Sequence, residues 1–233
     1  MSHDLIDTTE MYLRTIFELQ EEGIAAKRAR IVERLSQSGP TVSQTVARMQ
    51  RDGLLTLDDE NIIVLTEAGA DYAAVVMRRH RLAEVMLVQV LGVDVAEVHR
   101  EACRWEHVLT ETVERRILAL CNHPTHSPFG NPIPALDQLG EGPSAGAAGT
   151  DLATYRARLG DTATAHVLVT RIGETLQADD SLLTALLRAG VSAGAQVKVT
   201  SGADGGLLIG SGGEYLELTP QQAAQVFVQA PAR

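Results

Sequence analysis

The tripeptide Ser38-Gly39-Pro40 separates two short amphipathic segments and strongly restricts the backbone conformation between them. Serine is favoured as the N-cap of a helix and proline in its first turn, so the tripeptide ends one helix and begins another. Apolar side chains recur at helical spacing on both sides of it, as Ile31, Val32 and Leu35 and then as Val42, Val46 and Met49. Two short helices joined by a tight turn predict a helix-turn-helix.

The flanking segments extend this prediction. Residues 8–22 carry apolar side chains mostly on one face, and Asp7 followed by Glu10 resembles a capping signal, so a helix is expected there. Two β-rich runs, 54–57 and 62–65, are joined by Asp58-Asp59-Glu60-Asn61 and predict a hairpin. Three helices followed by a hairpin make a winged helix-turn-helix.

The pattern changes twice along the rest of the chain. Further helices are predicted at 66–91, 94–105 and 109–120. Their apolar residues exceed the needs of one small bundle, so we expect a homodimer seam among Ala73, Val76, Met77, Leu82, Met86, Leu87 and Val90. Proline and glycine dominate 124–134 and 140–149, which predicts an extended linker. Period-two runs at 166–172, 196–201, 207–210 and 215–218 predict a small all-β barrel.

Charge reverses its sign within the chain. The 233 residues include 30 acidic and 20 basic ones, and the net charge of −10 provides no overall attraction to nucleic acid or anionic lipid. Between Ala25 and Arg51, however, six basic residues stand against Glu33 alone, a local charge of +5. The hydrophobic fraction of 45% excludes a wholly disordered chain. With two cysteines, no signal sequence and no membrane span, we expect a soluble cytoplasmic protein.

The basic segment coincides with the helix-turn-helix, which predicts binding to double-stranded DNA. Arginines supply phosphate contacts, and small polar side chains at the start of the second helix reach base edges in the major groove. Gln44 can pair with adenine, and Thr41 or Pro40 can meet a thymine methyl group. The expected DNA-binding residues are Arg28, Arg30, Ser38, Pro40, Thr41, Ser43, Gln44, Arg48 and Arg51. A solvated basic face is the alternative, and the acidic residues 58–60 would repel phosphate.

Imidazole, carboxylate and sulfur groups recur at helical spacing farther along the chain, as His80 and Glu84 and then as His99, Cys103, Glu106 and His107. Facing helices that carry such groups build metal sites, and this mixture suits Fe(II), Mn(II), Co(II) or Ni(II) better than structural zinc. Two alternatives stay open. Spaced His and Glu pairs are commonly surface ion pairs, and His80, Glu84 and His99 also match the ligands of a non-haem iron oxygenase.

Five motifs resemble the diphtheria toxin repressor family, in particular its iron-dependent regulators from actinobacteria. They are 7–16 (DTTEMYLRTI), 38–46 (SGPTVSQTV), 79–84 (RHRLAE), 101–107 (EACRWEH) and 127–134 (SPFGNPIP). The resemblance implies an α+β chain, mostly α, and not an enzyme. Its expected parts are a winged helix-turn-helix domain at 1–73, a helical dimerisation and metal-binding domain at 74–140, a flexible linker at 141–150 and an SH3-like β-barrel at 151–233.

The resemblance also implies a function. A homodimeric repressor would bind operator DNA when Fe(II) is bound and release it when metal is scarce, controlling iron homeostasis genes. Co(II), Mn(II) or Ni(II) could substitute, and a manganese-responsive regulator or a repressor sensing a small organic ligand are alternatives. Two metal sites per subunit are implied: a stabilising one of His80, Glu84, His99, Glu174 and Gln177, and an activating one of Met11, Cys103, Glu106 and His107. Metal at the activating site is expected to move the first turn of the first helix, and activation is expected to weaken in acid.

Overall fold

The computed structural model describes residues 7–143, 146–159, 164–203 and 205–231, so the linker predicted at 141–150 lies partly outside the described residues. Internal contacts divide the chain into two compact units. Within the described ranges, the first unit takes in 7–83, 102–123 and 133–143. The second takes in 84–101, 124–132 and the described residues from 146 onward.

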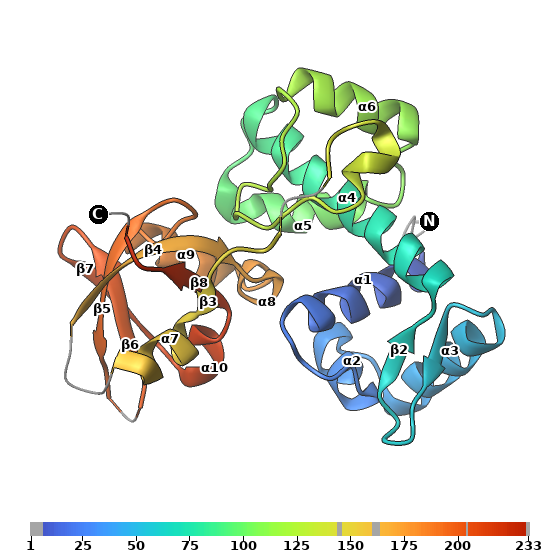
Figure 1. Ribbon diagram of the computed structural model, residues 1–233, viewed down its shortest axis with the longest axis horizontal. Helices are drawn as coiled ribbons and strands as arrows, with labels where there is room; N and C mark the ends of the chain where they lie inside the picture. Colours follow the sequence, from blue (N-terminus) through green and yellow to red (C-terminus); the bar gives the residue numbers. More distant parts are fainter. Residues whose placement is uncertain (1–6, 144–145, 160–163, 204, 232–233) are drawn as a thin grey trace. The chain divides into compact units, whose positions relative to one another are not determined.

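The first unit begins with the predicted winged helix-turn-helix. Its elements are α1 (Thr8–Glu21), α2 (Arg28–Leu35), α3 (Gly39–Arg51), β1 (Leu55–Leu57) and β2 (Ile63–Leu65) (Figure 1). Both predicted caps are confirmed: the side chain of Asp7 accepts from the N–H groups of Thr9 and Glu10, and that of Ser38 accepts from the N–H of Thr41. Capping satisfies amide groups that the first turn of a helix leaves without partners.

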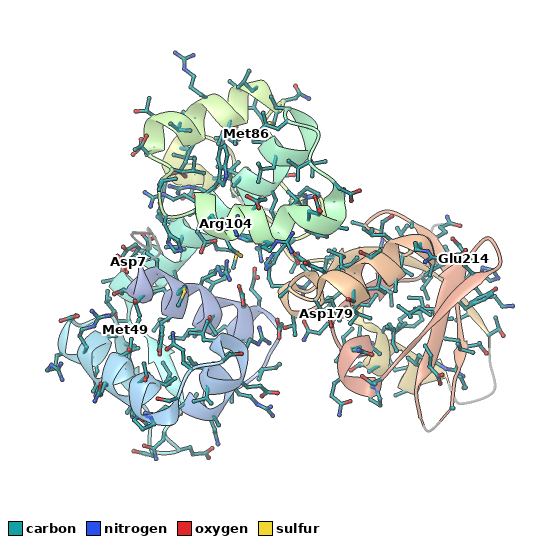
Figure 2. All side chains as sticks on the ribbon, turned by 180° about the vertical axis from the view of Figure 1, so that it is seen from behind. Asp7, Met49, Met86, Arg104, Asp179 and Glu214 are labelled. Atoms are coloured by element: carbon teal, nitrogen blue, oxygen red, sulfur yellow. The ribbon has the colours of Figure 1, made fainter. Side chains whose placement is uncertain are left out.

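Apolar side chains from all three helices and the hairpin form one core. It is built of Tyr12, Leu13, Ile16, Leu19, Ala26, Ile31, Val42, Val46, Met49, Leu55, Ile63 and Ala73, with Met49 labelled in Figure 2. The hairpin pairs Leu55 with Leu65 and Leu57 with Ile63. In the turn of the hairpin, the carboxylate of Asp58 accepts hydrogen bonds from the N–H groups of Glu60 and Ile62. One acidic residue of the wing therefore serves to shape the turn.

Three longer helices follow, α4 (Glu67–Gln89), α5 (Val95–Trp105) and α6 (Glu111–Leu120), and then the 3-10 helix η1 (Leu136–Leu139). A β-carbon at Gly69 would lie 1.8 Å from the carbonyl oxygen of Leu54, so only glycine lets α4 pass this close to the wing.

The prediction of a dimer seam was wrong for most of its residues. Ala73, Val76, Met77, Leu82 and Leu87 are buried within a single chain, whereas Val90 remains exposed.

The second unit is built on a six-stranded antiparallel sheet with the order β3-β8-β4-β5-β6-β7. The strands are β3 (Thr150–Asp151), β4 (Ala165–Ile172), β5 (Gln196–Ser201), β6 (Leu207–Ser211), β7 (Glu214–Leu218) and β8 (Val226–Gln229). This confirms the predicted C-terminal β domain. Four short helices of this unit were not predicted, because a helix of one or two turns gives almost no periodic signal. They are α7 (Leu152–Leu159), α8 (Glu174–Gln177), α9 (Asp180–Arg188) and α10 (Pro220–Ala223).

The proline-rich segment is a folded loop, and the prediction of an extended linker at 124–134 was wrong for 124–132. His126 and Pro132 form a β-bridge around a turn in which the N–H of Gly130 donates to the carbonyl of Ser127. Phe129 is buried, and its carbonyl accepts from the N–H of Ile172 on β4. Burial of this ring holds the loop in the second unit. Among the described residues, no helix is both long enough and apolar enough to cross a bilayer.

Candidate functional site

The first cluster consists of His80, Cys103, Glu106 and His107, all in the first unit. His80 lies on α4, Cys103 near the end of α5, and Glu106 and His107 in the turn after α5. Nδ1 of His80 is 2.7 Å from Oε2 of Glu106, and the ligand atoms of His80, Cys103 and Glu106 all lie within 4.8 Å of one another. Nε2 of His107 is 3.5 Å from Oε1 of Glu106. The turn after α5 therefore brings three predicted ligands of the activating site together.

Helix α1 of the winged helix-turn-helix contacts the same cluster. Oε2 of Glu10 is 2.6 Å from Nδ1 of His107, and Nη1 of Arg14 donates to Sγ of Cys103 and to Oε2 of Glu106. Met11, the fourth predicted ligand of the activating site, is half-buried on the turn between these two residues. Because residues three apart on a helix share a face, Met11 lies on the same side of α1 as Arg14.

Burial and neighbouring charges set the protonation of this cluster. Burial would raise the pKa of Glu106, but the Arg14 guanidinium and the hydrogen bond with His80 outweigh it and lower that pKa. Burial would lower the pKa of His107, but the hydrogen bond with Glu10 and the charge of Glu106 outweigh it and raise that pKa. The surroundings of Glu106 therefore favour the ionised form of its buried carboxylate.

Two atoms of the first cluster have unmet bonding capacity that a cation would use. Within the ranges that the structure describes, Oε1 of Glu106 and Nε2 of His107 are buried and make no hydrogen bond, although they face each other at 3.5 Å. An unpaired buried polar atom is costly, and such atoms commonly mark a ligand position. Imidazole, carboxylate and thiolate together suit first-row divalent ions. The donor set therefore fits a divalent metal ion.

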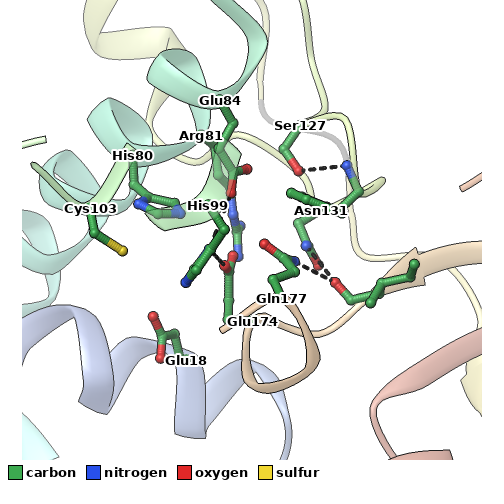
Figure 3. Close-up of polar contacts among 12 residues, drawn as sticks. Glu18, His80, Arg81, Glu84, His99, Cys103, Ser127, Asn131, Glu174 and Gln177 are labelled. Atoms are coloured by element: carbon green, nitrogen blue, oxygen red, sulfur yellow. Dashed lines mark hydrogen bonds and ion pairs between the residues drawn. The ribbon is translucent and has the colours of Figure 1, made fainter. Parts of the chain in front are cut away.

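The second cluster consists of Glu84, His99, Glu174 and Gln177, all in the second unit. Nδ1 of His99 is 3.3 Å from Oε1 of Glu84 and 3.3 Å from Oε2 of Glu174. Figure 3 shows these three side chains converging, with Gln177 beside Glu174. All four are buried. His80, the fifth predicted ligand of the stabilising site, lies one helical turn before Glu84 on α4, and its Nδ1 contacts Glu106 of the first cluster.

The short helix α8 positions two members of the second cluster. A β-carbon at its N-cap Gly173 would lie 2.2 Å from Oε1 of Gln225, so the chain enters α8 at a point that only glycine fits. Nε2 of Gln177 donates to the carbonyl of Ile172 (Figure 3), which directs the amide oxygen away from β4. In the described part of the chain that oxygen is buried and makes no hydrogen bond. Gln177 therefore also offers an oxygen ligand.

Helix α3 divides its side chains between the core and solvent. Val42, Thr45, Val46 and Met49 are buried. The predicted DNA-binding residues that are exposed are Arg30, Ser38, Pro40, Thr41, Ser43, Gln44, Arg48 and Arg51, while Arg28 is half-buried. Two of the arginines have protein partners: Arg30 pairs with Glu33, and Arg48 donates to the hydroxyl of Thr9 at the start of α1. The exposed face of α3 is thus polar and basic, as a recognition helix requires.

Comparisons with known proteins agree with this arrangement. Residues 4–60 match the sequence profile of the N-terminal DNA binding domain of iron dependent repressors, residues 66–135 that of their metal binding and dimerisation domain, and residues 162–230 that of the FeoA domain. The iron-dependent repressor IdeR of Mycobacterium tuberculosis (strain ATCC 25618 / H37Rv) is 50% identical over 228 residues, 97% of this chain and 99% of that protein. The chain belongs to the iron-dependent repressor family.

Other members of the iron-dependent repressor family match over similar lengths. The diphtheria toxin repressor of Corynebacterium diphtheriae is 46% identical over 229 residues, 97% of this chain and 98% of that protein. The solved structure of the manganese regulator SloR superposes with a TM-score of 0.77 at 28% identity, covering 96% of this chain and 98% of that one. A manganese-dependent transcriptional repressor in complex with manganese gives a TM-score of 0.78 at 28% identity, covering 96% and 100%. The predicted family and fold class are confirmed.

Sequence analysis of this family member missed Glu10 and Arg14. Both contact the first cluster, yet both occur in an ordinary amphipathic helix with no ligand-spaced neighbour. A signal was present: Glu10, Arg14 and Glu18 succeed one another at i, i+4 spacing on one face of α1, next to Met11. A charged stripe on a face that also carries a predicted ligand indicates that the stripe faces the same site.

Proposed function

We propose that this chain is a homodimeric transcriptional repressor that binds operator DNA when divalent metal is bound, with Fe(II) as the working ion. One observation carries this proposal: the half-buried thiol of Cys103 and the buried carboxylate and imidazole groups of the first cluster are in direct contact with α1 of a winged helix-turn-helix. A sensor placed there can alter the domain that reads DNA. Family membership supports the proposal and does not favour the metalloenzyme alternative.

The activating site is assigned to Met11, Cys103, Glu106 and His107. The buried atoms of Glu106 and His107 that make no hydrogen bond support this assignment, as does the position of Met11 between Glu10 and Arg14. The stabilising site is assigned to His80, Glu84, His99, Glu174 and Gln177, supported by the convergence of His99 with two carboxylates. A divalent ion would bring positive charge to each site and would bind several of these ligands at once.

Coupling to DNA would arise from the chain itself. Met11 belongs to α1, whereas Cys103, Glu106 and His107 belong to α5 and the turn after it, so holding all four together restrains α1 against α5. Arg48 of α3 donates to Thr9, two residues before Met11. A change in the first turn of α1 therefore reaches an arginine on the face proposed to bind DNA. By linkage, DNA must tighten metal binding to the same extent that metal tightens DNA binding.

The dimer interface is assigned to helix α6. Val113 and Leu120 are seven residues apart on the same face of this helix and are 40% and 68% exposed. Exposed large apolar side chains on a helix indicate a surface that another protein covers. The match of residues 66–135 to a metal binding and dimerisation domain supports this use. Two recognition helices held by one dimer would read two half-sites of an operator.

A gel shift with operator DNA tests the function. We expect the metal-free protein to leave the DNA unshifted and Fe(II), handled without oxygen, to produce a retarded complex, because the ligands of the first cluster must be gathered before α1 is restrained. Co(II) and Mn(II) are run in parallel, and half-saturation at a lower Mn(II) than Fe(II) concentration would assign the protein to manganese. Retardation of equal strength in the presence of a chelator would contradict metal control.

Replacing Gln44 with alanine should reduce sequence discrimination more than overall affinity. Gln44 is exposed on α3 and can form a bidentate pair with adenine, a contact that distinguishes bases at a cost of about 1–3 kcal/mol when lost. Competition between operator and random DNA measures this ratio in the metal-loaded protein. Arg51→Ala is the matched control on the same helix, since loss of a phosphate contact weakens both DNAs alike. An unchanged ratio in Gln44→Ala would remove Gln44 from the reading face.

A further inference from the structure

Nη1 of Arg14 lies among the ligands of the first cluster. It is 2.9 Å from Sγ of Cys103, 2.9 Å from Oε2 of Glu106 and 3.4 Å from Nδ1 of His80. A single cationic nitrogen thus contacts the thiol and the carboxylate that are assigned to the activating site, together with the neighbouring imidazole of His80. The Arg14 side chain is largely buried. The interior of the cluster therefore already contains a positive charge that the chain itself supplies.

We propose that the guanidinium of Arg14 takes the place of the metal ion in the metal-free protein, and that a divalent ion binds the first cluster only by displacing it. This inference rests on the proposed function, because it takes Cys103 and Glu106 of the first cluster as ligands of the activating site. Arg14 would thereby set the metal concentration at which the repressor responds.

Distances show why the two cations exclude each other. A divalent ion such as zinc binds thiolate sulfur at about 2.3 Å and carboxylate oxygen at about 2.0–2.2 Å. An ion held by Cys103 and Glu106 would lie between the two atoms that Nη1 now contacts at 2.9 Å. The ion and Nη1 would then overlap in space and repel each other strongly in a site with little water. Both cannot contact Cys103 and Glu106 at once.

Arg14 can leave the cluster without losing its charge or all its partners. Burial would lower the pKa of Arg14, but Cys103 and Glu106 outweigh it and hold that pKa well above the ordinary value. The side chain therefore leaves by rotation and not by deprotonation. Its Nε is already 3.1 Å from Oε1 of Glu18, one helical turn later on α1. Glu18 can keep Arg14 paired after Cys103 and Glu106 have been released.

The consequence for metal binding is a measurable competition. Every ion that binds must break two charge-assisted hydrogen bonds of Arg14, and such bonds are among the stronger ones in proteins. Removing the guanidinium removes that cost. An arginine with a merely structural role predicts the opposite, since its loss would loosen the packing of α1 against α5 and weaken metal binding.

A Co(II) titration of the full chain, followed by the thiolate-to-cobalt charge-transfer absorption, separates these cases. We expect Arg14→Leu to bind Co(II) about 10-fold or more tightly than the wild type. Arg14→Gln, equally uncharged, carries the same expectation if the leucine variant fails to fold. Arg34→Leu is the matched control: Arg34 also pairs with Glu18, and the two side chains are similarly buried, 15% against 14% exposed. We expect its affinity to equal that of the wild type.

The titration distinguishes failure of the competition from failure of the site assignment. Equal or weaker Co(II) binding by both neutral Arg14 variants, or an equal gain in Arg34→Leu, would overturn the competition while leaving the proposed function intact. Absence of the charge-transfer band in the wild type at saturating Co(II) would instead show that Cys103 is not a ligand. That result would overturn the assignment of the activating site, and the inference with it.

Discussion

Replacing Cys103 with alanine should abolish metal-activated DNA binding. Cys103 is the sole sulfur donor on the α5 side of the first cluster, and its Sγ accepts from Arg14 of α1. Without the thiol, the proposed site retains a thioether, a carboxylate and an imidazole, a weaker set for a soft first-row ion. We expect the metal concentration needed for half-maximal operator retardation to rise at least about 100-fold, since even ligand-supporting residues cost about 10–100-fold when lost.

Cys121 offers the matched control for this experiment. It is the other cysteine of the chain, it is buried at the end of α6, and burial raises the pKa of its thiol. A thiol of raised pKa in apolar surroundings is a poor ligand. Cys121→Ala is therefore expected to respond to metal as the wild type does. Equal losses in the two variants would point to damage of the fold and would refute a specific role for Cys103.

Replacing Glu114 with alanine should be strongly destabilising. Glu114 of α6 is fully buried, with Oε2 2.6 Å from Nε of Arg78 and Oε1 3.1 Å from Nε of Arg79. Arg78 is itself buried. Removing one partner of a buried ion pair leaves an uncompensated charge in the interior, which typically costs about 3–5 kcal/mol. Urea denaturation of the metal-free protein measures the loss in the free energy of unfolding.

Glu111→Ala, one turn earlier on α6, controls for the loss of a glutamate from this helix. Glu111 pairs with Arg115, but their side chains are 63% and 47% exposed. Solvent screens such a pair, and its removal is expected to cost about 0–1 kcal/mol. A Glu114→Ala protein as stable as Glu111→Ala would mean that the Arg78–Glu114 pair contributes nothing net, as happens when desolvation offsets attraction.

Local sequence signals were sufficient to predict a secondary-structure element where a few neighbouring residues determine the backbone conformation. Ser38 caps α3 as expected, and strands β4 and β5 follow the alternation of buried and outward residues. Such features depend on neighbours within a few residues, so a single sequence reveals them. The proline-rich loop at 124–132 was mispredicted for the converse reason. Its composition favours an extended chain, but burial of Phe129 and the hydrogen bond to Ile172 on β4 override that preference.

For the candidate site, donor spacing and the family resemblance predict which residues bind metal, but they do not predict every contact between those residues. His80 was assigned to the stabilising site, and that assignment stays a prediction; its Nδ1 also pairs with Glu106, a residue 26 positions away that was assigned to the activating one. Spacing along one helix predicts a shared face. It does not predict which second helix packs against that face, or which rotamers its side chains adopt.

The amino-acid sequence by itself determined the winged helix-turn-helix, the local excess of basic residues and the family, and it predicts the types of ligand, because caps, periodicity, charge and motifs are local properties. Only the tertiary structure decided that Glu10 and Arg14 of α1 enter the first cluster, and that Arg14 contacts both Cys103 and Glu106. Contacts between residues about ninety positions apart depend on how helices pack, and packing is decided by the whole core at once.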